Sequence, residues 1–224
     1  MHICLFDIDG TLLNSGGAGK AAIEAALIEE FGVLVQVQVP YSGRTDRAIG
    51  RDLLRFHGVA ETADNWQRLV RGYLERLPAA LNRHQGRVLP GIAALVRRLG
   101  ERHDVALGLL TGNIQAGARV KLGHYGLFDF FAFGGFGDHH FERDDVAREA
   151  LAAIQERYAG RYATERIWVI GDTPLDVQCA RAIGARAVAV ATGWHTVDQL
   201  RSTAPDLVLT DLADPEPLLG LIDR

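Results

Sequence analysis

Residues 3–11 read ICLFDIDGT, an apolar run that ends on two carboxylates and a glycine. The run predicts a buried β-strand, and its polar end predicts a site, because α/β proteins bind ligands at the carboxyl ends of parallel strands. Two carboxylates about 4 Å apart repel each other by roughly 4 kcal/mol at an effective dielectric near 20, so Asp7 and Asp9 favour a nearby cation. Taken alone, Asp9-Gly10 is also an ordinary turn dipeptide.

Two later stretches are also apolar runs that end on polar residues. Residues 167–176 read IWVIGDTPLD and stop on a second acidic group, whereas residues 105–113 read VALGLLTGN and stop on a hydroxyl and an amide. Because parallel strands bring their carboxyl ends to one edge of a sheet, these three ends predict one shared site.

Much of the chain alternates apolar strands with amphipathic helices. This alternation predicts an α/β fold: a Rossmann-like, mostly parallel sheet with helices on both faces. We expect strands near residues 2–8, 105–111, 130–134, 166–171, 186–191 and 206–209. We expect helices between them near residues 91–102, 114–125, 144–158 and 174–183.

Residues from about 16 to 88 interrupt the alternation. They contain helical patterns at 46–57 and 64–81, with no convincing strand between them. Glycine-rich or proline-rich joints, which suit a hinge, lie at both ends of this segment. The pattern predicts a core made of residues 1–15 and 89–224, with an α-helical insertion at 16–88.

Composition narrows the class of partner. The chain has 224 residues, enough for one domain of about 100–200 residues and a smaller insertion. A net charge of −4 and a pI near 6.1 argue against nucleic acid or an anionic membrane as a partner. Only two cysteines are present, and neither a signal peptide nor a membrane-spanning run is visible in the sequence. We therefore expect a cytoplasmic protein.

Three short motifs occur in a fixed order, DIDGT at 7–11, LTGN at 110–113 and GDTPLD at 171–176. They resemble motifs one, two and four of the haloacid dehalogenase superfamily, most closely its phosphoglycolate-phosphatase-like branch with an α-helical cap. The resemblance covers essentially the whole chain, and three ordered motifs are far more specific than one. It implies that residues 16–88 form a cap that opens for substrate entry and closes to exclude water.

The resemblance implies a Mg²⁺-dependent phosphatase that hydrolyses a small phosphomonoester, phosphoglycolate or another phosphorylated metabolite, through an aspartyl-phosphate. Asp7 would be the nucleophile, and Asp9 would protonate the leaving oxygen and later accept a proton from water. The Mg²⁺ ligands would be the side chains of Asp7 and Asp172 and the backbone carbonyl of Asp9. Asp176 would orient these ligands or metal-bound water without binding the ion itself. A competing interpretation of Asp172 and Asp176 is capping of the helix that starts near Pro174.

Phosphate oxygens would be held by Thr111, Gly112 and Asn113, through the hydroxyl and through backbone or amide donors at the start of the next helix. Asn113 has a competing interpretation as the N-cap of that helix.

Arg44 belongs to residues 42–46, SGRTD, a segment similar to one that related caps present to the substrate. Its guanidinium could bind a substrate carboxylate or hydroxyl. The competing interpretation is a helix start, in which Thr45 caps the helix and Arg44 is solvated.

The third motif departs from the family pattern. Where the family has a lysine, residues 141–146 read FERDDV, so we expect Arg143 beside the nucleophile and the phosphoryl group. An arginine fork does not fill space as an ammonium does. Lys121 is the rival for this role, and its place within a predicted helix favours a solvated lysine. Arg143→Ala is therefore expected to impair turnover far more than Lys121→Ala.

Two other functions stay open. A phosphomutase shares all four motifs, and a non-catalytic phosphate-binding protein would accommodate the altered third motif. A metal-independent dehalogenase is disfavoured, because it would not need the second aspartate of the first motif, Asp9.

Overall fold

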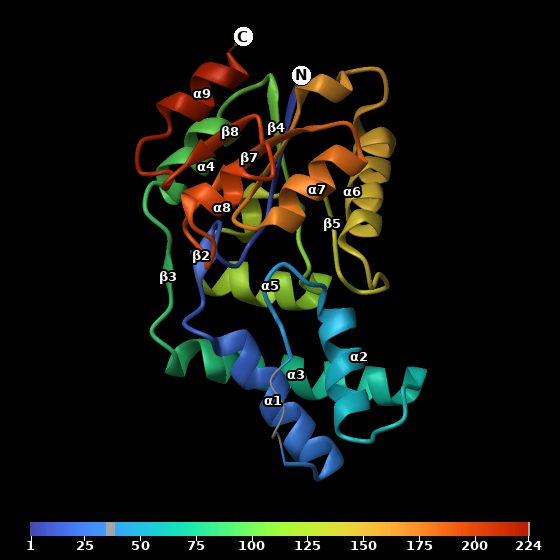
Figure 1. Ribbon diagram of the computed structural model, residues 1–224. Helices are drawn as coiled ribbons and strands as arrows, with labels where there is room; N and C mark the ends of the chain where they lie inside the picture. The colour runs from blue at the N-terminus through green and yellow to red at the C-terminus, as the bar shows by residue number, and fades with distance from the viewer. Residues whose placement is uncertain (35–38, 224) are drawn as a thin grey trace.

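The computed structural model describes residues 1–34 and 39–223. Within these residues the centre is a parallel sheet of six strands in the order β5-β4-β1-β6-β7-β8 (Figure 1). The strands are β1 (His2–Phe6), β4 (Val105–Leu110), β5 (Gly134–Gly135), β6 (Ile167–Gly171), β7 (Arg186–Val190) and β8 (Leu207–Leu209). The predicted α/β class is confirmed.

Alternate residues of the strands supply two separate hydrophobic cores. In β1, Cys4 and Phe6 pack on one face of the sheet, whereas Ile3 and Leu5 pack on the other. Because successive side chains of a strand point to opposite faces, burial on both faces produces a continuous apolar run. The helices on the first face are α4 (Ile92–Gly100), α5 (Gln115–His124) and α9 (Glu216–Ile222). Those on the second face are α6 (Arg143–Tyr158), α7 (Pro174–Ala182) and α8 (Val197–Arg201).

Three further helices form a layer beyond the carboxyl ends of the strands (Figure 1). They are α1 (Ala18–Phe31), α2 (Asp46–Phe56) and α3 (Ala63–Arg83). They share a hydrophobic core of their own, which Ile114 joins from the start of α5. The helical patterns expected at 46–57 and 64–81 are present, while the division of the chain into a core and a cap stays a prediction.

The structure contains one strand pair that was not predicted and shortens one predicted strand. At the end of the segment 16–88, β3 (Arg87–Val88) pairs antiparallel with β2 (Leu13–Asn14). This pairing joins residues on either side of the helical layer, so no local pattern reveals it. The strand expected at 130–134 is only Gly134–Gly135, because Phe128–Phe130 forms a 3₁₀-helix whose aromatic rings pack against the core.

The structure also bears on membrane association. Among the described residues, none of the helices combines the length and apolar character needed to cross a membrane.

Candidate active site

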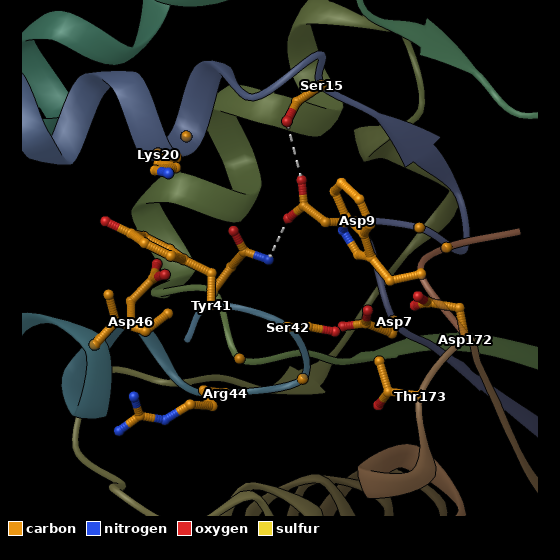
Figure 2. Close-up of a pocket in the computed structure, with 18 of the residues that line it drawn as sticks. Asp7, Asp9, Ser15, Lys20, Tyr41, Ser42, Arg44, Asp46, Asp172 and Thr173 are labelled. Atoms are coloured by element: carbon orange, nitrogen blue, oxygen red, sulfur yellow. Dashed lines mark hydrogen bonds between the residues drawn. The ribbon is translucent and has the colours of Figure 1, made fainter. Parts of the chain in front are cut away.

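The candidate site lies where the carboxyl ends of β1, β4 and β6 face the helical layer. A cavity of 490 Å³ occupies this position. Asp7 and Asp172 line it from the strand ends, and Lys20, Tyr41 and Arg44 line it from the helical layer (Figure 2). The structure therefore brings together the strand ends that the sequence singled out.

Asp7, Asp172 and Asp176 form a buried acidic cluster. One carboxylate oxygen from each residue lies within 4.8 Å of the other two. Burial, reinforced by Asp176, raises the pKa of Asp7 to about 7, although Arg143 opposes the shift. Burial, Asp176 and Asp7 together raise the pKa of Asp172 to about 8. The cluster resists carrying its full negative charge, so a bound cation would stabilise it.

The chemistry of this cluster fits a hard divalent cation. Asp7 and Asp172 both line the cavity, and carboxylate oxygens are ligands that Mg²⁺ prefers. The hydroxyl of Thr11 donates a hydrogen bond to Asp172 Oδ1 at 3.2 Å, which orients that carboxylate. Asp7 and Asp172 are therefore the side chains that could hold such an ion.

Asp176 is committed to other partners. Its Oδ2 accepts hydrogen bonds from the Thr173 N–H at 3.0 Å and the Thr173 hydroxyl at 2.7 Å, and its other oxygen accepts one from Arg143. Thr173 and Asp176 form a capping box at the start of α7. The capping interpretation is thus confirmed for Asp176 and wrong for Asp172, because Thr173 is the N-cap.

Arg143 begins α6 and reaches the acidic cluster. Its Nη1 lies 3.5 Å from Asp7 Oδ1, and its Nη2 forms an ion pair with Asp176. Burial opposes the charge, but Asp176 and Asp7 raise the pKa of Arg143, so the side chain stays a cation. Its buried Nε has no hydrogen-bond partner among the described residues, which leaves a donor for an anion.

Lys121 is not a solvated lysine, so that interpretation of the sequence is wrong. The residue is only 5% exposed, and its Nζ lies 2.6 Å from both Asp9 Oδ2 and Asn113 Oδ1. The helical layer causes the burial: a Cβ at Gly19 of α1 would lie 3.1 Å from Lys121 Nζ. The sequence held no local signal for this burial, because it depends on α1 packing next to Lys121.

Among residues 1–34 and 39–223, three side chains donate hydrogen bonds to the Asp9 carboxylate. Ser15 donates to Oδ1 at 3.2 Å (Figure 2). Both Asn113 and Lys121 donate to Oδ2, at 3.0 and 2.6 Å. Burial alone would raise the pKa of Asp9, but Lys121 and these hydrogen bonds outweigh burial and lower it. The side chain is still 38% exposed.

The loop after β4 is held by contacts that the sequence did not reveal. The Asn113 amide donates to Thr111 Oγ1 at 2.9 Å as well as to Asp9, so its side chain supports neighbouring residues. The N-cap prediction for Asn113 is wrong, because Ile114 occupies that position and has no capping bond from its own side chain. Gly112 lies so close to Arg44 that a Cβ there would overlap the Arg44 carbonyl oxygen.

Arg44 lines the cavity, but its guanidinium has partners. It donates to the carbonyl of Pro40 at 3.1 Å and forms a 2.6 Å ion pair with Asp52. Figure 2 shows this guanidinium turned away from Asp7 and Asp172. Thr45 caps α2 by accepting a hydrogen bond from the N–H of Ala48 at 3.0 Å, as one interpretation of the sequence predicted.

Sequence reasoning missed Asp46, which joins the helical layer to the loop after β4. Its Oδ2 accepts the N–H of Ile114 at 2.9 Å, and its own N–H donates to the carbonyl of Gly112 at 2.7 Å. Burial raises the pKa of Asp46 to about 6, although Lys121 opposes the shift. An acidic residue in the first turn of a helix is common, so the sequence held no signal for this contact.

Comparisons with known proteins identify the family and agree with the fold. The family model described as haloacid dehalogenase-like hydrolase matches residues 4–190. The phosphoglycolate phosphatase of Synechococcus elongatus is 28% identical over 216 residues, which span 96% of this chain and 95% of that protein. The crystal structure of a hydrolase from Pseudomonas syringae superposes with a TM-score of 0.73 at 23% identity and covers 99% of both chains. The structure of CbbY from Rhodobacter sphaeroides in complex with phosphate superposes with a TM-score of 0.69 at 22% identity and covers 96% of both chains.

Proposed function

Because the chain belongs to the haloacid dehalogenase-like hydrolase family, we propose that it is a Mg²⁺-dependent phosphatase that hydrolyses a small phosphomonoester through an aspartyl-phosphate on Asp7. The observation that carries the proposal is the convergence of Asp7, Asp172 and Arg143 at one end of the sheet. Because the transferred phosphoryl group is anionic, its transfer requires positive charge beside the nucleophile. The guanidinium supplies one such charge, and the acidic cluster suits a cation that supplies another.

In the first step an oxygen of Asp7 attacks phosphorus, and the bond from phosphorus to the leaving oxygen breaks. The protonated carboxyl of Asp9 gives its proton to that oxygen, so the leaving group departs as an alcohol and Asp9 becomes a carboxylate. Asp9 suits this role because it lines the same cavity as Asp7 and is partly exposed there, although Lys121 lowers its pKa and so opposes the protonated form that the first step needs.

In the second step a water molecule attacks the phosphorus of the aspartyl-phosphate. The water gives a proton to the Asp9 carboxylate while the bond between phosphorus and Asp7 breaks. Inorganic phosphate leaves, Asp7 is again a carboxylate, and Asp9 again carries the proton needed for the next turnover.

Several groups would hold the reacting atoms in place. The side chains of Asp7 and Asp172 and the backbone carbonyl of Asp9 would hold Mg²⁺, which when bound supplies positive charge beside the phosphoryl oxygens. Arg143 holds Asp7 and adds its own charge. Thr111, Gly112 and Asn113 lie in the loop that would receive the phosphoryl oxygens, and Asp176 keeps Arg143 oriented.

The substrate we propose is phosphoglycolate or a similarly small phosphorylated metabolite. This rests on relatives at 28% and 26% identity that are named phosphoglycolate phosphatases. Residues 16–88 would act as the cap that encloses the substrate, since Lys20, Tyr41 and Arg44 line the cavity opposite the strand ends. For Arg44 to bind a substrate carboxylate, its guanidinium would have to exchange Asp52 for the ligand.

The test measures release of inorganic phosphate from a panel of phosphorylated metabolites, with and without Mg²⁺. We expect Mg²⁺-dependent release by the wild type, complete loss in Asp7→Asn, and a mass increase of one phosphoryl group on Asp7 after rapid acid quenching. Asp198→Asn is the matched control, because the Asp198 side chain is 91% exposed. Absence of phosphate release with every substrate and divalent metal would support a binding protein, and phosphoryl transfer between substrate positions without release would support a mutase.

A further inference from the structure

We propose that Lys121 is a positioning residue for the general acid, holding the Asp9 carboxyl group where it meets the leaving oxygen. This inference rests on the proposed phosphatase function. It assigns a role to the one lysine that the structure buries, a residue outside the motifs that define the site. It follows that substitution of Lys121 lowers activity most for substrates whose leaving group needs a proton.

The first observation is the geometry around Asp9. Lys121 Nζ lies 2.6 Å from Asp9 Oδ2 and 2.6 Å from Asn113 Oδ1, while the Asn113 amide donates to the same Asp9 oxygen at 3.0 Å. These contacts close a ring of three side chains. Among the three donors to Asp9, Lys121 is the charged one and the closest, and charge-assisted hydrogen bonds are roughly twice as strong as neutral ones.

The second observation is how the ammonium group is enclosed. Lys121 extends from α5 toward α1. Gly19 of α1 has no side chain and therefore leaves room for the Nζ atom. Tyr73 of α3 is also buried against this part of α5. Only 5% of Lys121 is exposed, so solvent reaches the ion pair from the side of Asp9, whose side chain is 38% exposed.

The third observation separates the roles of the two buried cations. Arg143 forms ion pairs with Asp7 and Asp176, whereas Lys121 forms one with Asp9. Two of the three N–H donors of Lys121 are already used by Asp9 and Asn113. Arg143 therefore pairs with the nucleophile Asp7, and Lys121 pairs with the general acid Asp9.

The chemistry predicts a dependence on the leaving group. An alkyl alcohol, as in phosphoglycolate, leaves poorly without a proton, whereas p-nitrophenolate leaves readily as an anion. A defect in the general acid therefore slows formation of the aspartyl-phosphate from alkyl phosphates far more than from p-nitrophenyl phosphate. A defect in phosphate binding or in folding slows both alike.

The experiment compares kcat/KM for phosphoglycolate and p-nitrophenyl phosphate in the wild type and in Lys121→Met, because kcat/KM reports the first chemical step. We expect Lys121→Met to lose about 100-fold with phosphoglycolate and less than about fivefold with p-nitrophenyl phosphate. Arg148→Met is the control, since Arg148 is an exposed cation paired with Asp145 and does not line the cavity. It should leave the ratio of the two kcat/KM values unchanged.

Equal losses with both substrates in a Lys121→Met protein that unfolds at the wild-type temperature would overturn the inference, as would no loss with either. If Lys121→Met does not fold, Lys121→Gln is read in the same way, and failure of both to fold would show a structural role instead. Wild-type protein that releases phosphate from neither substrate would count against the proposed function. Wild-type activity with an unchanged ratio in the variant would count against Lys121 alone. Another alkyl phosphate replaces phosphoglycolate if the metabolite panel identifies a different substrate.

Discussion

The backbone of Gly193 lies directly against the carboxylate of Asp172: a Cβ atom at position 193 would overlap Asp172 Oδ2. Gly10 approaches the same carboxylate from the turn that follows β1, and a Cβ there would lie 2.5 Å from Oδ2. Gly10 also has a φ of +88°, a conformation that side-chain-bearing residues rarely adopt. Two glycines therefore leave the space that Asp172 occupies beside Asp7.

Gly193→Ala should displace Asp172 and weaken the proposed metal site. In wild-type protein, Mg²⁺ at 100 times its dissociation constant should add about 2.7 kcal/mol to the free energy of unfolding, because a ligand that binds the folded state stabilises it by mass action. The variant should show less than about half of this gain in thermal unfolding with Mg²⁺ against EDTA. Gly220→Ala is the control, since a Cβ there meets nothing within 4 Å. An undiminished gain in Gly193→Ala would contradict the placement of the ion beside Asp172.

Arg143→Met should destabilise the metal-free protein by roughly 3–5 kcal/mol, because it leaves Asp7 and Asp176 as buried carboxylates without a counter-charge. Urea unfolding in EDTA measures this change. Arg148→Met, which removes an exposed arginine paired with Asp145 in the same helix, should cost less than about 1 kcal/mol. Equal effects of the two substitutions would show that Arg143 does not neutralise the cluster.

Gly112→Ala should loosen the contact between the helical layer and the loop after β4. The new Cβ would overlap the carbonyl oxygen of Arg44, so the hydrogen bond from the Asp46 N–H to the Gly112 carbonyl should be strained. We expect the amide of Asp46 to exchange with deuterium about tenfold faster, corresponding to roughly 1.4 kcal/mol of lost protection. Gly123→Ala, in open space on α5, should leave that exchange unchanged. Unaltered exchange in Gly112→Ala would contradict the prediction. It would show that the loop moves to make room for the Cβ while the contact with the helical layer is kept.

Local patterns were sufficient for most of the fold. The strand that contains Cys4 and Phe6 is visible as a continuous apolar run, because both of its faces are buried. The helices that follow the later strands are visible because burial of one face imposes a period of 3.6 residues. Strand β3 was not predicted, and β5 was predicted at 130–134 but lies at Gly134–Gly135. A strand of two residues depends on its partner strand rather than on its own composition. The site followed the same division: Asp7 and Asp172 were identifiable at strand ends, whereas Asp46 carried no local signal.

The linear chain was enough to establish that two acidic strand ends and a hydroxyl-bearing one meet at a common edge, because parallel strands align their carboxyl ends. Only the tertiary structure decided which buried cation forms an ion pair with which aspartate. Lys121 and Asp9 are 112 residues apart, and their ion pair forms because α1 and α3 cover α5 and exclude water from the lysine. Such a contact depends on how separate layers pack, and residue spacing alone carries no record of that packing.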